Sequence, residues 1–125
     1  MLMNEVKYLT KEEIIKIHEK IIEETGGTSG LLNEGLLDIV LEQTKISDDI
    51  IQKSIVLVFG IIQNHPFVDG NKRTGLECMD IFLDYNNKNF QIENMSEAED
   101  IILKIANNKI SRNSVRKWID NCTGD

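Results

Sequence analysis

The chain has 125 residues, of which 41% are hydrophobic and 28% are charged, and its formal net charge at pH 7 is −7. A chain of this length buries about two-thirds of its unfolded surface, so we expect a single domain over residues 1–125. The acidic balance argues against nucleic acid as a substrate, because binding it requires clustered cations. Five of the fourteen basic residues gather late in the chain, where we interpret them as a solvated face or a protein-docking surface: Lys104, Lys109, Arg112, Arg116 and Lys117.

Cysteine and histidine usage gives no sign of a metal centre. Cys78 and Cys122 fit no metal-binding spacing, and neither do the two histidines, His18 and His65. We expect Cys78 to lie in the core and Cys122 in a frayed tail, in a reducing, cytoplasmic setting. No N-terminal stretch has the layout of a signal peptide, and no apolar run reaches transmembrane length, so we expect no membrane contact.

The first predicted helix follows a mixed lead-in over residues 1–9. Thr10 and Glu13 have the spacing of a capping box, which predicts that a helix begins there. Four isoleucines then recur at helical spacing: Ile14, Ile17, Ile21 and Ile22. His18 falls beside this apolar stripe, and we interpret it as a packed or edge histidine rather than a ligand.

The next segments indicate further helices separated by turns. Residues 25–30 contain three glycines and predict a loop. One or two short helices follow over residues 31–43, with Asn33 as a plausible cap. Residues 47–49 are expected to cap a third segment, 50–63. This segment is so apolar that periodicity does not separate a buried helix from a buried strand, but its length without a turn favours a helix.

The second half of the chain continues the helical pattern. Residues 74–86 are apolar around most of the helix circumference, which predicts a central position. Residues 90–92 are too short to assign. A second capping box at Ser96–Glu99 predicts a helix through about Asn107, and Ser111–Ser114 begins a last one whose Val115, Trp118 and Ile119 face inward. The chain is therefore expected to be an all-α, compact single-domain helical bundle with room for one short β segment.

The stretch from Asn64 to Gly75 lies between the two most apolar predicted helices and holds the only proline. Because a helix follows, residues 70–73 lie at its N-terminus, where backbone N–H groups lack intrahelical acceptors and the dipole is positive. Gly70 permits close approach of the backbone to a ligand, and Lys72 and Arg73 add two cations. Together these features predict an anion site.

Three other residues of this stretch complete the chemistry that phosphate transfer requires. Asp69 offers a hard oxygen ligand for Mg²⁺ when phosphates supply others. The imidazole of His65 is a residue type that accepts a hydroxyl proton near neutral pH. Asn71 can orient the loop or donate to a phosphate oxygen.

Each of these residues also has an ordinary interpretation. A His-Pro step often ends a helix, Asp-Gly-Asn favours a turn, and cations in a first turn are usually solvated. However, Lys72 and Arg73 oppose the helix dipole, which costs roughly a few tenths of a kcal/mol each unless an anion offsets them. Such a local conflict is typical of a functional site.

The order His-Pro-Phe-x-Asp-Gly-Asn-Lys-Arg over residues 65–73 resembles the signature loop of the Fic/Doc proteins. Lys72 makes it similar to the Doc ("death on curing") branch, because the commoner Fic pattern has glycine there and a further arginine where this chain has Leu76. The likeness covers nearly the whole chain, including residues 9–19, 26–30, 82–83 and 110–119. It departs from Doc at Gly70, where Doc has alanine, and at Gln63-Asn64, where Doc has Arg-Gly.

This resemblance implies a Fic/Doc-type bundle with the active loop held between two central helices and positioned by Pro66 and Phe67. It implies ATP bound with Mg²⁺ through Asp69, and His65 as the base that deprotonates a hydroxyl of a protein substrate. The residues implied to contact the nucleotide phosphates are Gly70, Asn71, Lys72 and Arg73. The residues implied to form a flap that seats the target chain are Gly26, Gly27, Thr28, Ser29 and Gly30.

The resemblance also bears on the reaction. Lysine at position 72 implies transfer of the γ-phosphate, as in a Ser/Thr kinase toxin that phosphorylates a threonine of elongation factor Tu. AMP transfer to a protein hydroxyl is the alternative on the same scaffold, and a catalytically silent binding module is a third hypothesis. No segment matches the inhibitory helix of self-restrained Fic proteins, which implies an antitoxin protein acting in trans.

Overall fold

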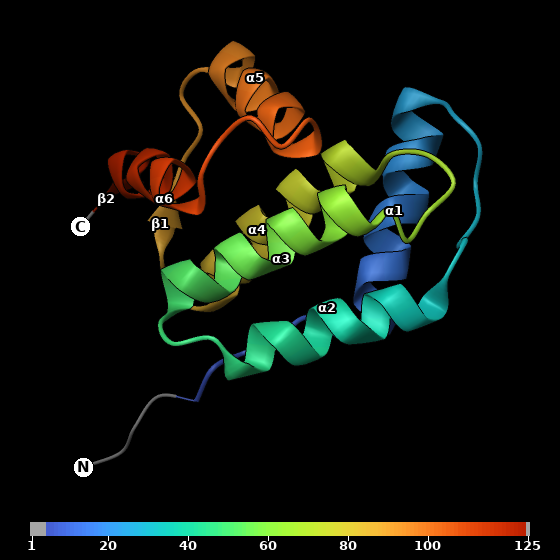
Figure 1. Ribbon diagram of the computed structural model, residues 1–125, viewed down its shortest axis with the longest axis horizontal. Helices are drawn as coiled ribbons and strands as arrows, with labels where there is room; N and C mark the ends of the chain where they lie inside the picture. The colour runs from blue at the N-terminus through green and yellow to red at the C-terminus, as the bar shows by residue number, and fades with distance from the viewer. Residues whose placement is uncertain (1–4, 125) are drawn as a thin grey trace.

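The computed structural model describes residues 5–124, which form six α-helices and a two-stranded antiparallel sheet. The elements in chain order are α1 (Lys11–Thr25), α2 (Glu34–Ile46), α3 (Ile50–Asn64), α4 (Asn71–Tyr85), β1 (Asn89–Phe90), α5 (Met95–Ala106), α6 (Arg112–Asn121) and β2 (Thr123–Gly124). Figure 1 shows α3 and α4 side by side at the centre, with α2 below them, α1 across one end, and α5 and α6 above and to the left. The all-α class and the short β segment are confirmed.

The α3–α4 pair lies at the centre of the molecule because each of the two helices contributes apolar residues to two separate buried clusters. One buried cluster joins them to α5 and α6, and a second joins them to α1 and α2. The two helices approach closely at Gly75, where a Cβ atom would lie only 2.8 Å from Cγ1 of Ile62. The apolar segment that periodicity left ambiguous is thus a helix, and Cys78 is buried in the core as expected.

Most predicted helix starts are confirmed, and two are shifted. Thr10 forms both hydrogen bonds of its capping box with Glu13, while Asn33, Asp49 and Ser111 accept from backbone N–H groups of their helices. The capping box at Ser96–Glu99 is wrong. The N-cap is Asn94, two residues before Ser96, so the α5 helix begins at Met95; the side chain of Asn94 accepts from the N–H of Glu97 at 3.1 Å.

The α4 helix begins at Asn71 rather than Thr74. Of the one or two helices expected after the glycine-rich loop, the structure has one, α2. The α4 helix begins this early because Gly70 serves as its N-cap. Gly70 takes a left-handed conformation (φ 78°, ψ 15°) and makes no side-chain hydrogen bond to the helix. A side chain at this position would be strained and would lie 3.2 Å from Cδ1 of Ile22. Residues 71–73 are therefore the first turn of the helix itself.

The C-terminal segment is more ordered than the sequence suggested. The prediction of a frayed tail is wrong, since Thr123–Gly124 pairs with Asn89–Phe90 and the carbonyl oxygen of Cys122 accepts from the N–H of Gln91 at 2.8 Å. Residues 5–9 have no regular secondary structure, while residues 1–4 of the predicted lead-in lie outside the described residues. Within residues 5–124, no helix combines the length and apolarity needed to cross a bilayer.

Two of the late basic residues take part in packing. Arg116 forms a two-pronged ion pair with Asp49, the N-cap of α3, at 3.1 and 3.2 Å, and the guanidinium of Arg112 lies 5.2 Å from the ring centroid of Phe59. The interpretation of this region as a purely solvated face therefore needs correction, because these two side chains fasten α6 to α3.

A buried lysine links α3 to the end of α2. Lys53 is 5% exposed, and its Nζ donates to the carbonyl oxygens of Thr44, Lys45 and Ser47 at 3.1, 3.0 and 2.7 Å. These carbonyls lie at the helix C-terminus, where a cation also complements the dipole. The lysine thus replaces the backbone hydrogen bonds that α2 lacks at its end.

We expect Lys53→Met to lower the free energy of unfolding by about 1–3 kcal/mol, because it removes three charge-assisted hydrogen bonds while keeping the apolar stem. Urea denaturation measures this change. The exposed Lys45→Met serves as control and should stay within about 0.5 kcal/mol of the parent. An unchanged midpoint for Lys53→Met would show that water satisfies these carbonyls equally well.

Asp80 on α4 is a source of pH-dependent stability. Burial, with repulsion from Glu77 and Asp84, raises the pKa of the Asp80 carboxyl to about 6. The folded state then holds the Asp80 proton more tightly than the unfolded state does. Protonation of Asp80 therefore stabilises the fold, fully below the unfolded pKa of about 3.9, and this stabilisation is lost as pH rises through about 6.

Asp80→Asn should therefore stabilise the protein at pH 7 by about 1 kcal/mol, a value reduced from the full shift because solvent screens the half-buried carboxylate. The gain should vanish near pH 4, as measured by urea denaturation at both pH values. Glu19→Gln, an exposed change on α1, should show no such pH dependence. A gain of equal size at both pH values would contradict this account.

Candidate functional site

Residues 65–70 connect the two central helices, so both ends of this loop are anchored in the core. His65 adopts a left-handed conformation (φ 52°, ψ 59°) and closes the C-terminus of α3, while its side chain is exposed. Pro66 and Phe67 are buried, and Phe67 belongs to the core cluster shared by α1, α2, α3 and α4. The predicted location of the loop is confirmed, and Pro66 and Phe67 lie where they can fix its path.

The side chain of Asn71 holds the loop closed. Its Oδ1 accepts from the N–H of Phe67 at 3.1 Å, and its Nδ2 donates to the carbonyl oxygen of Phe67 at 2.9 Å. The same Nδ2 lies 3.1 Å from Nδ1 of His65. Because the backbone of Phe67 fixes which end of the carboxamide is the donor, Nδ1 of His65 is the acceptor, and the neutral ring carries its proton on Nε2.

The positive end of α4 opens into a cavity. The helix has no side-chain N-cap and no acidic residue in its first turn, and Lys72 and Arg73 are exposed there. The cavity has a volume of about 380 Å³, and its lining residues are Gly70, Asn71, Lys72, Arg73, Glu99, Ile102 and Leu103. The structure thus brings the four residues predicted to bind phosphate into one cavity. Glu99 of α5 was not predicted, and its Oε1 lies 4.0 Å from Nη2 of Arg73.

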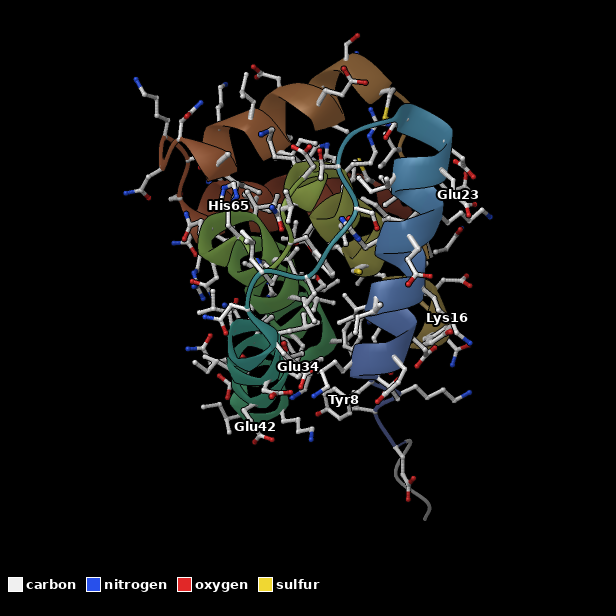
Figure 2. The ribbon with its side chains drawn as sticks, turned by 90° about the vertical axis from the view of Figure 1, so that its right-hand side faces the viewer. Tyr8, Lys16, Glu23, Glu34, Glu42 and His65 are labelled. Atoms are coloured by element: carbon white, nitrogen blue, oxygen red, sulfur yellow. The ribbon has the colours of Figure 1, made fainter. Side chains whose placement is uncertain are left out.

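The glycine-rich segment that the resemblance names as a flap lies against the loop. The N–H of Val68 donates to the carbonyl oxygen of Gly30 at 3.0 Å, and that of Leu32 donates to Pro66 at 2.7 Å. Figure 2 shows this segment running from the top of α1 toward α2, with His65 labelled beyond it. The backbone φ angles of Gly26, Gly27 and Gly30 are all positive, which explains why this path requires glycine.

Asp69 faces the flap rather than the cavity. Its Oδ2 accepts from the N–H of Thr28 at 2.9 Å, and Asp69 is absent from the residues that line the cavity at α4. Among residues 5–124, no group of three or more His, Cys, Asp or Glu side chains could hold a metal ion. A single exposed carboxylate suits Mg²⁺ when phosphate oxygens and water supply the other ligands. In this geometry Asp69 is engaged with the flap, and its role as a metal ligand stays a prediction.

His18 is the loop contact that the sequence did not indicate. It is buried, as interpreted, but its Nε2 lies 2.7 Å from the carbonyl oxygen of Asp69, and its ring stacks on Phe67 with centroids 3.8 Å apart and planes 6° apart. The stripe of isoleucines on α1 placed His18 near the core. Nothing in the sequence pattern pointed to a partner 51 positions away.

Comparison with known proteins shows the family of the chain. The model of the Fic/DOC family matches residues 8–83, which include α1 to α3, most of α4, the flap and the loop. The chain belongs to the Fic/Doc family. It is also similar to the protein kinase Doc of Escherichia phage P1, with 27% identity over 116 residues that cover 88% of this chain and 90% of that protein. The α5 helix, which completes the cavity at α4, lies outside the family match.

Asn71→Asp tests the closure of this Fic/Doc loop. The change keeps the shape of the side chain but removes both Nδ2 donors and sets a carboxylate oxygen against the carbonyl of Phe67. Because Asn71 is 4% exposed, we expect a loss of about 2–4 kcal/mol in the free energy of unfolding, measured by urea denaturation. The exposed Asn113→Asp is the matched control, expected to stay within about 0.5 kcal/mol. Equal stabilities for the two variants would refute the role of Asn71.

Proposed function

We propose that this protein is an ATP-dependent kinase of the Doc type that phosphorylates a threonine hydroxyl of a target protein. The observation that carries the proposal is the positive end of α4, where free backbone N–H groups, Lys72 and Arg73 meet at one cavity with no first-turn acid to balance them. The name of the phage P1 relative, a protein kinase, supports the same reaction class.

Binding of the nucleotide would use the residues at this helix end. The N–H groups of the first turn and the guanidinium of Arg73 suit phosphate oxygens, and Lys72 adds a charge that favours the γ-phosphate. Asp69 would hold Mg²⁺, which neutralises phosphate charge when it is bound. Since phosphoryl transfer depends mainly on positioning and electrostatic stabilisation, these groups supply most of what the reaction needs.

His65 would act as the base. It takes the proton of the acceptor hydroxyl as that oxygen bonds to the γ-phosphorus and the bond to the β-phosphate oxygen breaks, releasing ADP. In the observed geometry the lone pair of Nδ1 is taken by the amide of Asn71. The ring must therefore exchange Asn71 for the hydroxyl before it accepts a proton, and its exposed position allows it to turn.

The family resemblance supplies the candidate partners. Elongation factor Tu is the proposed acceptor, which places the reaction in the cytoplasm, and an antitoxin protein is the proposed inhibitor in trans. The flap over residues 26–30 would seat the acceptor chain, since it already pairs with the loop beside His65.

ATP labelled at the α- or the γ-phosphate, with elongation factor Tu as acceptor, tests the reaction. We expect γ-label alone on the acceptor. His65→Ala should lower kcat by about 10²–10⁴-fold because it removes the base, while calorimetry shows an unchanged Kd for Mg-ATP. Lys109→Ala, an exposed change far along the chain, is the control and should match the parent.

The other outcomes separate the alternatives. Transfer of α-label would identify an AMP transferase on this scaffold. Absence of both transfer and binding heat, with harmless expression in cells, would identify a silent binding module.

A further inference from the structure

His18 belongs to α1 yet contacts Phe67 and Asp69 of the loop and lies close to the position where Gly70 lacks a side chain. Its ring stacks on Phe67, its Nε2 meets the carbonyl oxygen of Asp69 at 2.7 Å, and a Cβ atom at position 70 would lie 3.7 Å from the same nitrogen. The side chain is 2% exposed, so these contacts are shielded from water. No step of the proposed reaction uses this histidine.

The direction of the hydrogen bond is fixed by its acceptor. A backbone carbonyl only accepts, so Nε2 of His18 must carry the proton and donate to Asp69. This holds for the neutral ring with its proton on Nε2 and for the charged ring alike. The contact therefore does not depend on the charge of the imidazole, and a side chain that donates from the same place without ionising can replace it.

The bond to His18 orients the peptide unit that leads into α4. The peptide between Asp69 and Gly70 is trans, as are all peptide bonds of the described residues, so its C=O and N–H point in opposite directions. Because the carbonyl is turned toward His18, the N–H of Gly70 is turned away from it. Gly70 is the N-cap of α4 and lines the cavity at that helix end.

We propose that His18 is a positioning residue of the phosphate site, acting through the Asp69–Gly70 peptide. By holding the carbonyl of Asp69, it aligns the N–H of Gly70 with those of the first turn of α4, so that they form one row of donors for a nucleotide phosphate. This role rests on the proposed function, because it assumes that Mg-ATP binds at this helix end.

A purely structural role for His18 makes a different prediction. If only its packing mattered, an aromatic ring that stacks on Phe67 would serve as well. If the hydrogen bond to Asp69 matters, glutamine should replace histidine better than phenylalanine does, because its amide Nε2 reaches about as far as Nε2 of histidine and also donates. His18→Phe and His18→Gln therefore separate the stack from the hydrogen bond.

The experiment measures Kd for Mg-ATP by calorimetry, and KM and kcat by γ-label transfer, in the full chain. For His18→Phe we expect Kd and KM to rise about tenfold, which corresponds to the loss of one hydrogen bond, with kcat within about threefold because His65 is held by Asn71 instead. His18→Gln should stay within about threefold of the parent in all three quantities. The ¹³C′ chemical shift of Asp69 should be displaced in the Phe variant and retained in the Gln variant. If the Phe variant fails to fold, His18→Leu takes its place.

Several results would overturn the proposal. A Phe variant that binds Mg-ATP as tightly as the parent would remove the role of the donor. A Gln variant as weak as the Phe variant would show that a donor at this place does not by itself position the peptide, and the proposal would fall. Both results leave the proposed kinase function standing. A parent chain that binds no Mg-ATP would instead overturn the proposed function, and this role with it.

Discussion

The pairing of the Asn71 carboxamide with the backbone of Phe67 is the interaction on which the geometry of the loop depends. It joins the first residue of α4 to the middle of the loop, and it leaves one amide proton to hold His65. The pairing is effective because the helices on both sides are themselves fixed in the core, where Gly75 lets them pack closely. A short loop clamped in this way holds its functional groups in place without a large enclosed pocket.

The electrostatics of α4 show the cost of this arrangement. A helix that begins with two cations and no acid works against its own dipole. The protein tolerates this because the penalty is small compared with a typical stability of about 5–15 kcal/mol, and because α4 is secured by packing rather than by its end. Glu99 across the cavity balances Arg73 only weakly, since both side chains are about half exposed and 4.0 Å apart. Positive charge therefore remains available to a ligand.

Local chemistry made most of the helices predictable, whereas contacts between distant segments were not. The cap residues Thr10, Asn33, Asp49 and Ser111 act within four residues of chain, so their patterns can be read directly. The error at Ser96 arose because Asn94 competes for the same helix end. The hydrogen bond from His18 to Asp69 and the three bonds made by Lys53 depend on how helices pack, and no spacing within one segment encodes them. The loop residues were predictable as a group because they are consecutive, but the orientation of Asp69 toward the flap was not.

The placement of the two chain ends has a practical consequence. In Figure 1 both ends of the described chain lie at the left of the bundle, whereas the 65–70 loop lies at the right, beyond the far ends of α3 and α4. The β1–β2 pairing keeps residues 123–124 on that left side. A tag or linker that continues the chain from either end of residues 5–124 would therefore start on the side away from the loop. The protein can then be immobilised on a surface for binding assays while the loop stays accessible.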